Sequence, residues 1–180
     1  EPLDLTHATI VVRGHGAPSA EQTAATVLRE EVGKRTGLEW PVAQSWPQSG
    51  PVVVVMSGDD RKVAGHTLPE GLRTDKPEGY AIGTDSSDPT KPVVWVAGTD
   101  PRGALFGVGY LMRKLEWRPG QAALAQPLNL VTAPEYPLRG HQLGYRARAN
   151  SWDAWTAEQF DQYIRELAFF GTNAIENIPL

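Results

Sequence analysis

Short β-branched runs separated by polar turns are the clearest pattern along the first half of the chain. Residues 51–57 (PVVVVMS) show no polar alternation, which is typical of a strand covered on both faces and predicts the centre of a sheet. Residues 78–84 and 92–98 flank a polar connection and predict an antiparallel hairpin. Two further strands are predicted at residues 8–13 and 38–44. The second of these is expected at a sheet edge because it contains a proline, which cannot donate to a strand ladder.

An amphipathic helix is predicted over residues 20–36, between two of these strands. Its apolar residues recur at three- and four-residue spacing, so one face of the helix is expected to pack on the sheet. Ser19 is predicted as the N-cap, with Gln22 completing a capping box. Gly37 is predicted as the left-handed residue that ends the helix.

A second helix is predicted from Asp100, whose side chain can cap it, to about residue 117. A proline follows the cap at the first helical position, where its missing N–H is no loss. Gly103, Gly107 and Gly109 lie inside this helix, and each costs up to about 1 kcal/mol relative to alanine. We therefore expect the helix backbone to lie close to the sheet or to another element.

The remaining segments of the first part carry weaker signals. Residues 61–65 predict a short helical turn, residues 118–127 a linker-like loop and residues 128–131 a short strand. The fold class predicted for this part is α+β, a mixed β-sheet with helices packed on one face.

The last part of the chain predicts a strand, a loop, a helix and a second strand. The strands are expected at residues 138–146 and 173–178 and the helix at residues 157–170, capped by Thr156 with Gln159 as its capping-box partner. Two strands joined by a crossover helix form the repeating unit of a (β/α)8 barrel, which takes about 250 residues. Too few residues remain here for such a barrel to close.

Two domains are therefore expected. Residues 1–133 predict a small α/β domain, and residues 134–180 predict the start of a TIM-barrel catalytic domain that is incomplete. A proline pair at residues 134 and 137 separates them.

Composition narrows the possible partners. The 180 residues carry 17 basic and 21 acidic side chains without a long run of either sign, which argues against a nucleic-acid groove or an anionic membrane surface. No apolar run reaches the roughly 18 residues that span a bilayer. The chain has no cysteine, which excludes disulfides and thiolate metal sites. Residues 14–19 (GHGAPS) lack the fingerprint of a phosphate-binding loop, and no cofactor is predicted.

Residues 94–117 (VWVAGTDPRGALFGVGYLMRKLEW) carry a family resemblance. With the preceding strands and helix, they resemble the small N-terminal α/β domain that precedes the barrel in family 20 β-N-acetylhexosaminidases and in α-glucuronidases. That domain has Arg-Gly, an aromatic residue, Gly-Tyr and a helix ending in Leu-Glu. The matching residues here are Arg102, Gly103, Phe106, Tyr110, Leu115 and Glu116.

The resemblance continues into the second domain. In family 20 the first barrel strand opens with proline and then Arg-Gly, and that arginine contacts the sugar beside the cleaved bond. Residues 137–140 (PLRG) stand at the equivalent place, so the resemblance implies that Arg139 contacts substrate. Gly144 stands where family 20 has an acidic residue, and residues 173–179 lack its His-x-His pair. The resemblance therefore implies a relative with different sugar chemistry, whose catalytic carboxylates lie near later strands.

The residues predicted to bind substrate are Arg139, Tyr145, Arg146, Trp152 and Glu176. Arg139 has two interpretations, since its guanidinium can hold sugar hydroxyls or form a structural ion pair at the bottom of a barrel. Trp152 and the nearby Trp155 can stack on a sugar or serve as hydrophobic cover. One carboxylate is not the pair that glycoside hydrolysis normally requires, so no catalytic residue is assigned.

Two functions of different class follow from these observations. The first is the N-terminal portion of an exported, periplasmic or extracellular glycoside hydrolase with its signal peptide removed. This portion is inactive by itself and reaches its glycan substrate through an intramolecular catalytic domain. The second is a stand-alone carbohydrate-binding or protein-interaction module. An exposed apolar face on the last helix, with unpaired strands beside it, would favour the first function.

Overall fold

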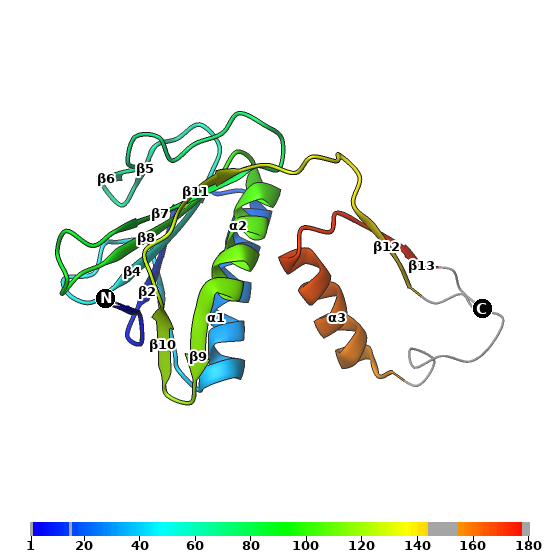
Figure 1. Ribbon diagram of the computed structural model, residues 1–180, viewed down its shortest axis with the longest axis horizontal. Coiled ribbons are helices and arrows are strands. Elements are labelled where there is room, and N and C mark those ends of the chain that lie inside the picture. Colours follow the sequence, from blue (N-terminus) through cyan, green and yellow to red (C-terminus); the bar gives the residue numbers. More distant parts are fainter. Residues whose placement is uncertain (1, 15, 144–154, 178–180) are drawn as a thin grey trace. The chain divides into compact units, whose positions relative to one another are not determined.

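The computed structural model describes residues 2–14, 16–143 and 155–177 (Figure 1). The chain forms two compact units, Glu1–Ala133 and Pro134–Leu180.

A six-stranded mixed sheet organises the first unit, with strand order β11-β7-β8-β4-β2-β3. Strands β3, β2, β4 and β8 run parallel to one another, whereas β7 and β11 are antiparallel to their neighbours. The bounds are β2 (Thr9–Val12), β3 (Val42–Ala43), β4 (Val52–Ser57), β7 (Tyr80–Asp85), β8 (Val93–Gly98) and β11 (Asn129–Thr132). Every residue of β4 is buried and β3 lies at one edge, which confirms both predictions from the sequence.

Two helices, α1 (Ser19–Thr36) and α2 (Pro101–Lys114), pack on each other and on one face of this sheet (Figure 1). This arrangement confirms the predicted α+β class with helices on one face. Two of the three glycines of α2, Gly103 and Gly107, lie close to the sheet as expected. A Cβ built at Gly103 would lie 2.2 Å from the carbonyl oxygen of Gly79, and one at Gly107 would lie 2.7 Å from Cγ1 of Val96.

The start of α2 is as predicted, but the start of α1 is not. Asp100 caps α2 by accepting a hydrogen bond from the N–H of Gly103. In α1, Ser19 is already inside the helix and Pro18 is the N-cap, without a side-chain hydrogen bond. Gln22 instead donates to the carbonyl of Ala17. The predicted capping box is therefore wrong, because Ser19 cannot cap a helix whose first turn includes it.

The opposite face of the sheet carries an apolar cluster that includes Trp95, Leu68 and Leu72. A small hairpin adjoins it, formed by β5 (Lys62–Val63) and β6 (His66–Thr67). The helical turn predicted at residues 61–65 is thus wrong. Ala64 and Gly65 both have positive φ, which is the backbone conformation of a two-residue hairpin turn.

A second sheet was not predicted. Helix α2 ends at Lys114, earlier than expected, and the chain continues as β9 (Leu115–Arg118), β10 (Gln121–Leu124) and their partner β1 (Leu3–Asp4). The linker-like loop predicted at residues 118–127 therefore contains a strand. Strands β9 and β10 form a local hairpin around Pro119 and Gly120, and β10 also pairs with β1, which lies far away in the sequence.

The second unit contains β12 (Gly140–Leu143), α3 (Ala157–Phe169) and β13 (Ala174–Asn177). The two strands pair in parallel, with Gly140 opposite Ala174. Thr156 and Gln159 form the predicted capping box, and Gly171 has the predicted left-handed conformation.

Candidate functional site

The five predicted substrate-binding residues fall into two groups. Tyr145, Arg146 and Trp152 lie outside the described residues. Arg139 and Glu176 are described and belong to the strand–helix–strand unit. Although these two residues are far apart in the sequence, the parallel pairing of β12 with β13 brings their segments side by side.

Arg139 immediately precedes β12, at the amino ends of the two strands. Its Nε donates to the carbonyl of Gly171 over 2.7 Å, and its Nη1 donates to the carbonyl of Tyr136 over 2.8 Å. The backbone N–H of Arg139 donates to Oδ1 of Asn173. Asn173 in turn donates its own N–H to the carbonyl of Arg139 and its Nδ2 to the carbonyl of Pro137.

These bonds join the entry of β12 to the segment between α3 and β13. Arg139 thus engages the carbonyl oxygens of Gly171, just beyond the C-cap of α3, and of Tyr136 in the segment before β12. The contact of Arg139 with a sugar stays a prediction.

Glu176 lies on the opposite face of the strand pair from α3. Successive side chains of a strand alternate between faces. His141 contacts Tyr163 of α3, so the neighbouring Gln142 points away from the helix. Gln142 lies opposite Glu176 in the register, and its Nε2 donates to Glu176 Oε2 over 3.2 Å. An exposed amide and carboxylate thus form a polar pair on this face.

An aromatic cluster on the helix side was not anticipated from the sequence. Trp155 contacts the rings of Phe160 and Tyr163 edge-on, with centroid distances of 5.4 and 5.1 Å. The Tyr163 hydroxyl lies 3.0 Å from Nε2 of His141. These contacts support the hydrophobic-cover interpretation of Trp155. The spacing of aromatic residues 155, 160 and 163 around the start of the helix was the sequence feature that could have predicted this cluster.

No metal centre is formed within the described part of the chain, where no three or more His, Asp or Glu side chains gather suitably. Among the same residues, no helix combines the length and apolar character needed to cross a bilayer.

Comparison with known proteins finds a similar fold in parts of several glycoside hydrolases. No protein-family model matches the chain, and no curated protein matches it in sequence. The similarity is to solved structures, in each case over nearly all of this chain and a minor part of the other. It confirms the resemblance to family 20 hexosaminidases and α-glucuronidases.

Three solved structures illustrate the likeness. A GH20 exo-β-N-acetylglucosaminidase from Vibrio harveyi, in complex with N-acetylglucosamine, matches with a TM-score of 0.66 and 12% identity over 98% of this chain and 23% of that chain. The chitobiase of Flavobacterium johnsoniae matches with a TM-score of 0.59 and 16% identity over 98% and 24%. A GH115 4-O-methyl-α-glucuronidase matches with a TM-score of 0.63 and 12% identity over 98% and 25%. At such identities the likeness concerns the fold alone, and the chain spans about a quarter of each enzyme.

Proposed function

We propose that this chain is the N-terminal portion of a glycoside hydrolase that cleaves O-glycosidic bonds of a glycan. The observation that carries the proposal is the order of its parts. A mixed sheet with two helices on one face is followed by a parallel strand–helix–strand unit. The same fold recurs, over nearly the whole chain, within enzymes of families GH20 and GH115.

In this proposal the second unit is the first step of a (β/α)8 barrel. A barrel strand turns one face to its surrounding helix and the other to the barrel interior. Gln142 and Glu176 occupy the face away from α3. They would therefore point into the barrel interior, and Glu176 is proposed to bind substrate there.

The chemistry of such barrels takes place at the carboxyl ends of the strands. The chain leaves β12 at Leu143 and enters the segment that holds Tyr145, Arg146 and Trp152, which follows that end directly. We keep these three residues as proposed substrate contacts. Arg139 lies at the other end of β12, so its side chain is the least favourably placed for a sugar.

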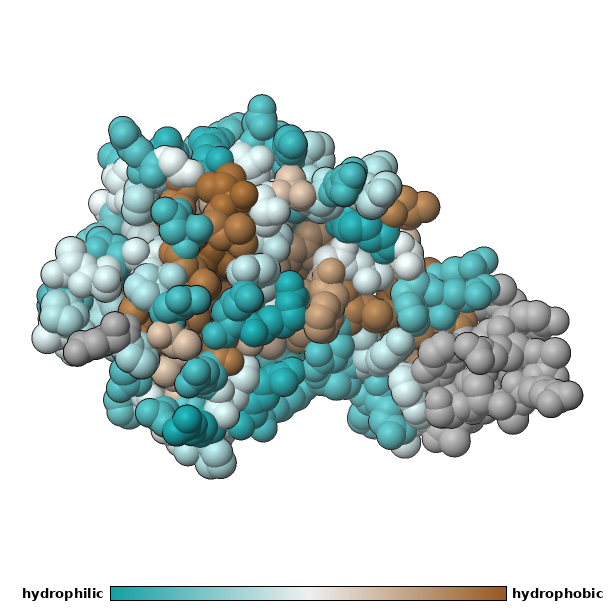
Figure 2. All heavy atoms as spheres, viewed as in Figure 1, coloured by the Kyte–Doolittle hydropathy of each residue, from teal (hydrophilic) through white to brown (hydrophobic). Residues whose placement is uncertain are grey.

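The exposed apolar residues of the second unit support its role as part of a larger assembly. Ile164 and Phe170, in and just after α3, are 42% and 68% exposed, and Ile175 of β13 is 38% exposed. Hydrophobic residues reach the surface in several places on the face shown in Figure 2. Among the described residues, β12 and β13 pair only with each other, so each keeps a free edge. Further strands and helices of a barrel would cover these groups.

Catalysis by this proposed enzyme requires two carboxyl groups, one as general acid and one as base or nucleophile. Glu176 alone does not provide that pair. The catalytic carboxylates are proposed to lie on later barrel strands, and the 180 residues are proposed to be inactive by themselves. Export to the periplasm or the extracellular space is part of the proposal and rests on the family resemblance and the composition.

The test is to read the gene beyond the codon for Leu180. The expected result is an open reading frame of roughly 200 or more codons whose pattern alternates strands with helices, as a (β/α)8 barrel requires. A stop codon directly after Leu180 would contradict the proposal and favour the stand-alone binding module.

A further inference from the structure

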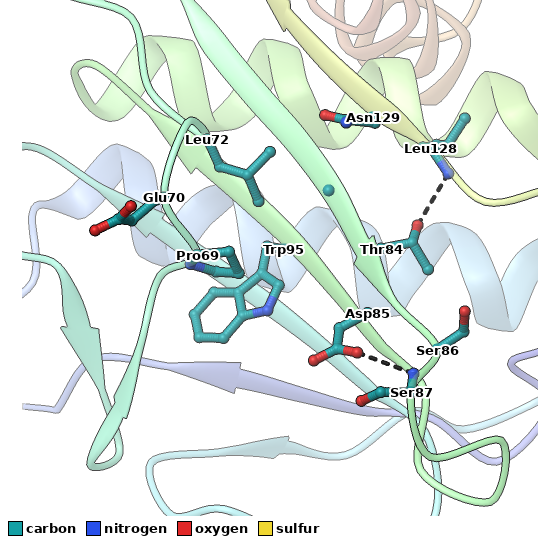
Figure 3. Close-up of a pocket in the computed structure, with 11 residues that line it drawn as sticks. Pro69, Glu70, Leu72, Thr84, Asp85, Ser86, Ser87, Trp95, Leu128 and Asn129 are labelled. Atoms are coloured by element: carbon teal, nitrogen blue, oxygen red, sulfur yellow. Dashed lines mark hydrogen bonds between the residues drawn. The ribbon is translucent and has the colours of Figure 1, made fainter.

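A hollow lies on the face of the six-stranded sheet that the helices leave uncovered. Asn129, Gly83 and Trp95 are direct neighbours across strands β11, β7 and β8. Cross-strand neighbours share a face of a sheet, so the side chains of Asn129 and Trp95 lie on either side of Gly83, which has no side chain. The resulting hollow has a volume of about 440 Å³. Figure 3 shows its lining residues around that position.

The floor of this hollow is apolar and its rim is polar. Leu72 lies against Gly83, so closely that a Cβ built on the glycine would lie 2.2 Å from Cδ1 of Leu72. Pro69 and the indole of Trp95 continue the apolar surface. The carboxylates of Glu70 and Asp85 and the amide of Asn129 belong to the rim. The lining thus combines apolar residues with several polar groups. The volume lies within the range of about 300–1,000 Å³ for small-molecule sites.

Trp95 supplies an unused hydrogen-bond donor. Its side chain is only 4% exposed. Within residues 2–14, 16–143 and 155–177, no group accepts a hydrogen bond from the indole Nε1–H of Trp95. Among the same residues, every side-chain nitrogen that is fully buried has a hydrogen-bond partner. The indole nitrogen is therefore not fully enclosed, and Trp95 is one of the residues that line the hollow. In Figure 3 it lies on the edge of the ring that faces Asp85.

Asp85 supplies a charged acceptor in the lining of the same hollow, two residues along β7 from Gly83 and therefore on the same face of the sheet. Its Oδ1 accepts the backbone N–H of Ser87 over 3.0 Å. Hydrogen bonding from Ser87, first from its backbone and then from its side chain, lowers the pKa of Asp85. The carboxylate is therefore ionised at neutral pH, and its second oxygen can accept from a ligand.

The polar groups select one class of ligand. A hydroxyl can accept from the indole N–H and at the same time donate to a carboxylate. An ammonium group has donors only and would leave the indole N–H unsatisfied. An anion would accept from the indole but would be repelled by Asp85 and Glu70. The apolar floor suits the C–H face of a sugar ring.

We propose that this hollow binds one neutral pyranose residue. A ring hydroxyl is held between the indole N–H of Trp95 and the carboxylate of Asp85, and Asn129 contacts a neighbouring hydroxyl. The site belongs to the first unit and does not depend on the proposed glycosidase function.

The test is an NMR titration of the 180-residue chain with the methyl glycosides of glucose, galactose and mannose. Methylammonium chloride and sodium acetate serve as charged comparison ligands. The expected result is a saturable shift of the Trp95 indole N–H and of the Gly83 amide for at least one glycoside, with a millimolar Kd. No saturable shift with any of the three glycosides overturns the proposal. Equal or tighter binding of methylammonium or acetate at the same two groups also overturns it.

Three variants locate the site. Asp85→Asn is expected to weaken binding at least about tenfold, and Asn129→Ala about threefold. The first effect is larger because a hydrogen bond to a charged group contributes more than one to a neutral group. Trp95→Phe removes the N–H and part of the ring surface and is expected to weaken binding at least about threefold. Asp88→Asn is the matched control, because Asp88 lies in the same β7–β8 connection and its carboxylate bonds to Thr90. Circular dichroism checks folding, and unchanged affinity in both Asp85→Asn and Asn129→Ala overturns the assignment even if Trp95→Phe does not fold.

Discussion

Arg13 donates hydrogen bonds from its guanidinium to the carboxylate of Glu21, which is completely buried in the first turns of α1. The Ser57 hydroxyl at the end of β4 donates to the same carboxylate. The hydrogen bond with Glu21 raises the pKa of Arg13. One carboxylate therefore links β2, β4 and α1 at the carboxyl ends of two parallel strands.

Removing Arg13 is expected to destabilise the chain strongly. Arg13→Ala leaves the Glu21 charge buried without its cation, which is expected to cost about 3 kcal/mol in the free energy of unfolding. Urea unfolding followed by circular dichroism measures this. Arg29→Ala is the control, because Arg29 lies exposed on the same helix, and it is expected to change stability by less than about 0.5 kcal/mol. Similar losses in both variants would contradict a special role for the Arg13–Glu21 pair.

The two helices are expected to respond oppositely to a glycine-to-alanine change. At Gly103 in α2 the new Cβ would lie 2.2 Å from a backbone oxygen, so Gly103→Ala is expected to destabilise by about 2 kcal/mol or more. At Gly33 in α1 the nearest atom would lie 3.6 Å away, and Gly33→Ala is expected to stabilise by up to about 1 kcal/mol. Thermal unfolding of both variants measures the contrast. Equal effects would show that helix propensity, and not packing, dominates at both positions.

Asp100 is expected to stabilise two segments at once. Its Oδ1 accepts the N–H of Gly103 and its Oδ2 accepts the N–H of Glu78, each over 2.8 Å. Asp100→Ala leaves both donors without an acceptor and is expected to cost about 2–3 kcal/mol. Asp100→Asn is expected to cost about half as much, because the amide keeps one acceptor oxygen. Denaturant unfolding measures both, with Asp75→Ala in an exposed loop as control. If Asp100→Asn were as unstable as Asp100→Ala, the two oxygens of Asp100 would not each contribute a separate hydrogen bond to stability.

The titration of Asp85 is expected to depend on Ser87. Since its pKa is lowered from 3.8 in the folded chain, the contribution of Asp85 to stability is fully present above that pH. It is lost as the pH falls through the lower, folded value. Carboxyl-carbon NMR is expected to give a midpoint below 3.8. Ser87→Ala, which keeps the backbone N–H, is expected to raise the midpoint only in part. A midpoint at or above 3.8 in the unchanged chain would rule out this hydrogen bond.

The 180 residues alone are expected to show no glycosidase turnover. Aryl β-N-acetylglucosaminide, aryl α-glucuronide and aryl β-glucoside are suitable substrates, with release of the aryl group as the measurement. The expectation follows from the proposal that the catalytic carboxylates lie on later barrel strands, because glycoside hydrolysis normally requires two carboxyl groups. Turnover that copurifies with the chain and disappears in Glu176→Gln would contradict the proposal that the catalytic carboxylates lie outside these 180 residues.

Several elements could be predicted from the sequence because their signals are local. The buried run of β4, the hairpin of β7 and β8, and the capping residues Asp100, Thr156 and Gln159 all act within a few positions of themselves. The prediction failed in part because a contact was distant, since β10 pairs with β1 at the other end of the first unit as well as with its neighbour β9. It also failed at local features, such as the β5–β6 hairpin. The start of α1 shifted because the chain could begin the helix one residue earlier, after Pro18.

The candidate sites divide in the same way. The sequence by itself determined the type of the elements with strong local patterns, such as β4, β7, β8, α2 and α3, and placed Glu176 near the end of a strand, since periodicity and capping are properties of neighbouring residues. Only the tertiary structure decided that Gln142 and Glu176 pair on one face, that Arg139 bonds to carbonyls at the amino ends of the strands, and that Gly83 leaves a hollow between Trp95 and Asn129. These relationships depend on strand register, which is set by long-range pairing and burial rather than by any residue's immediate neighbours.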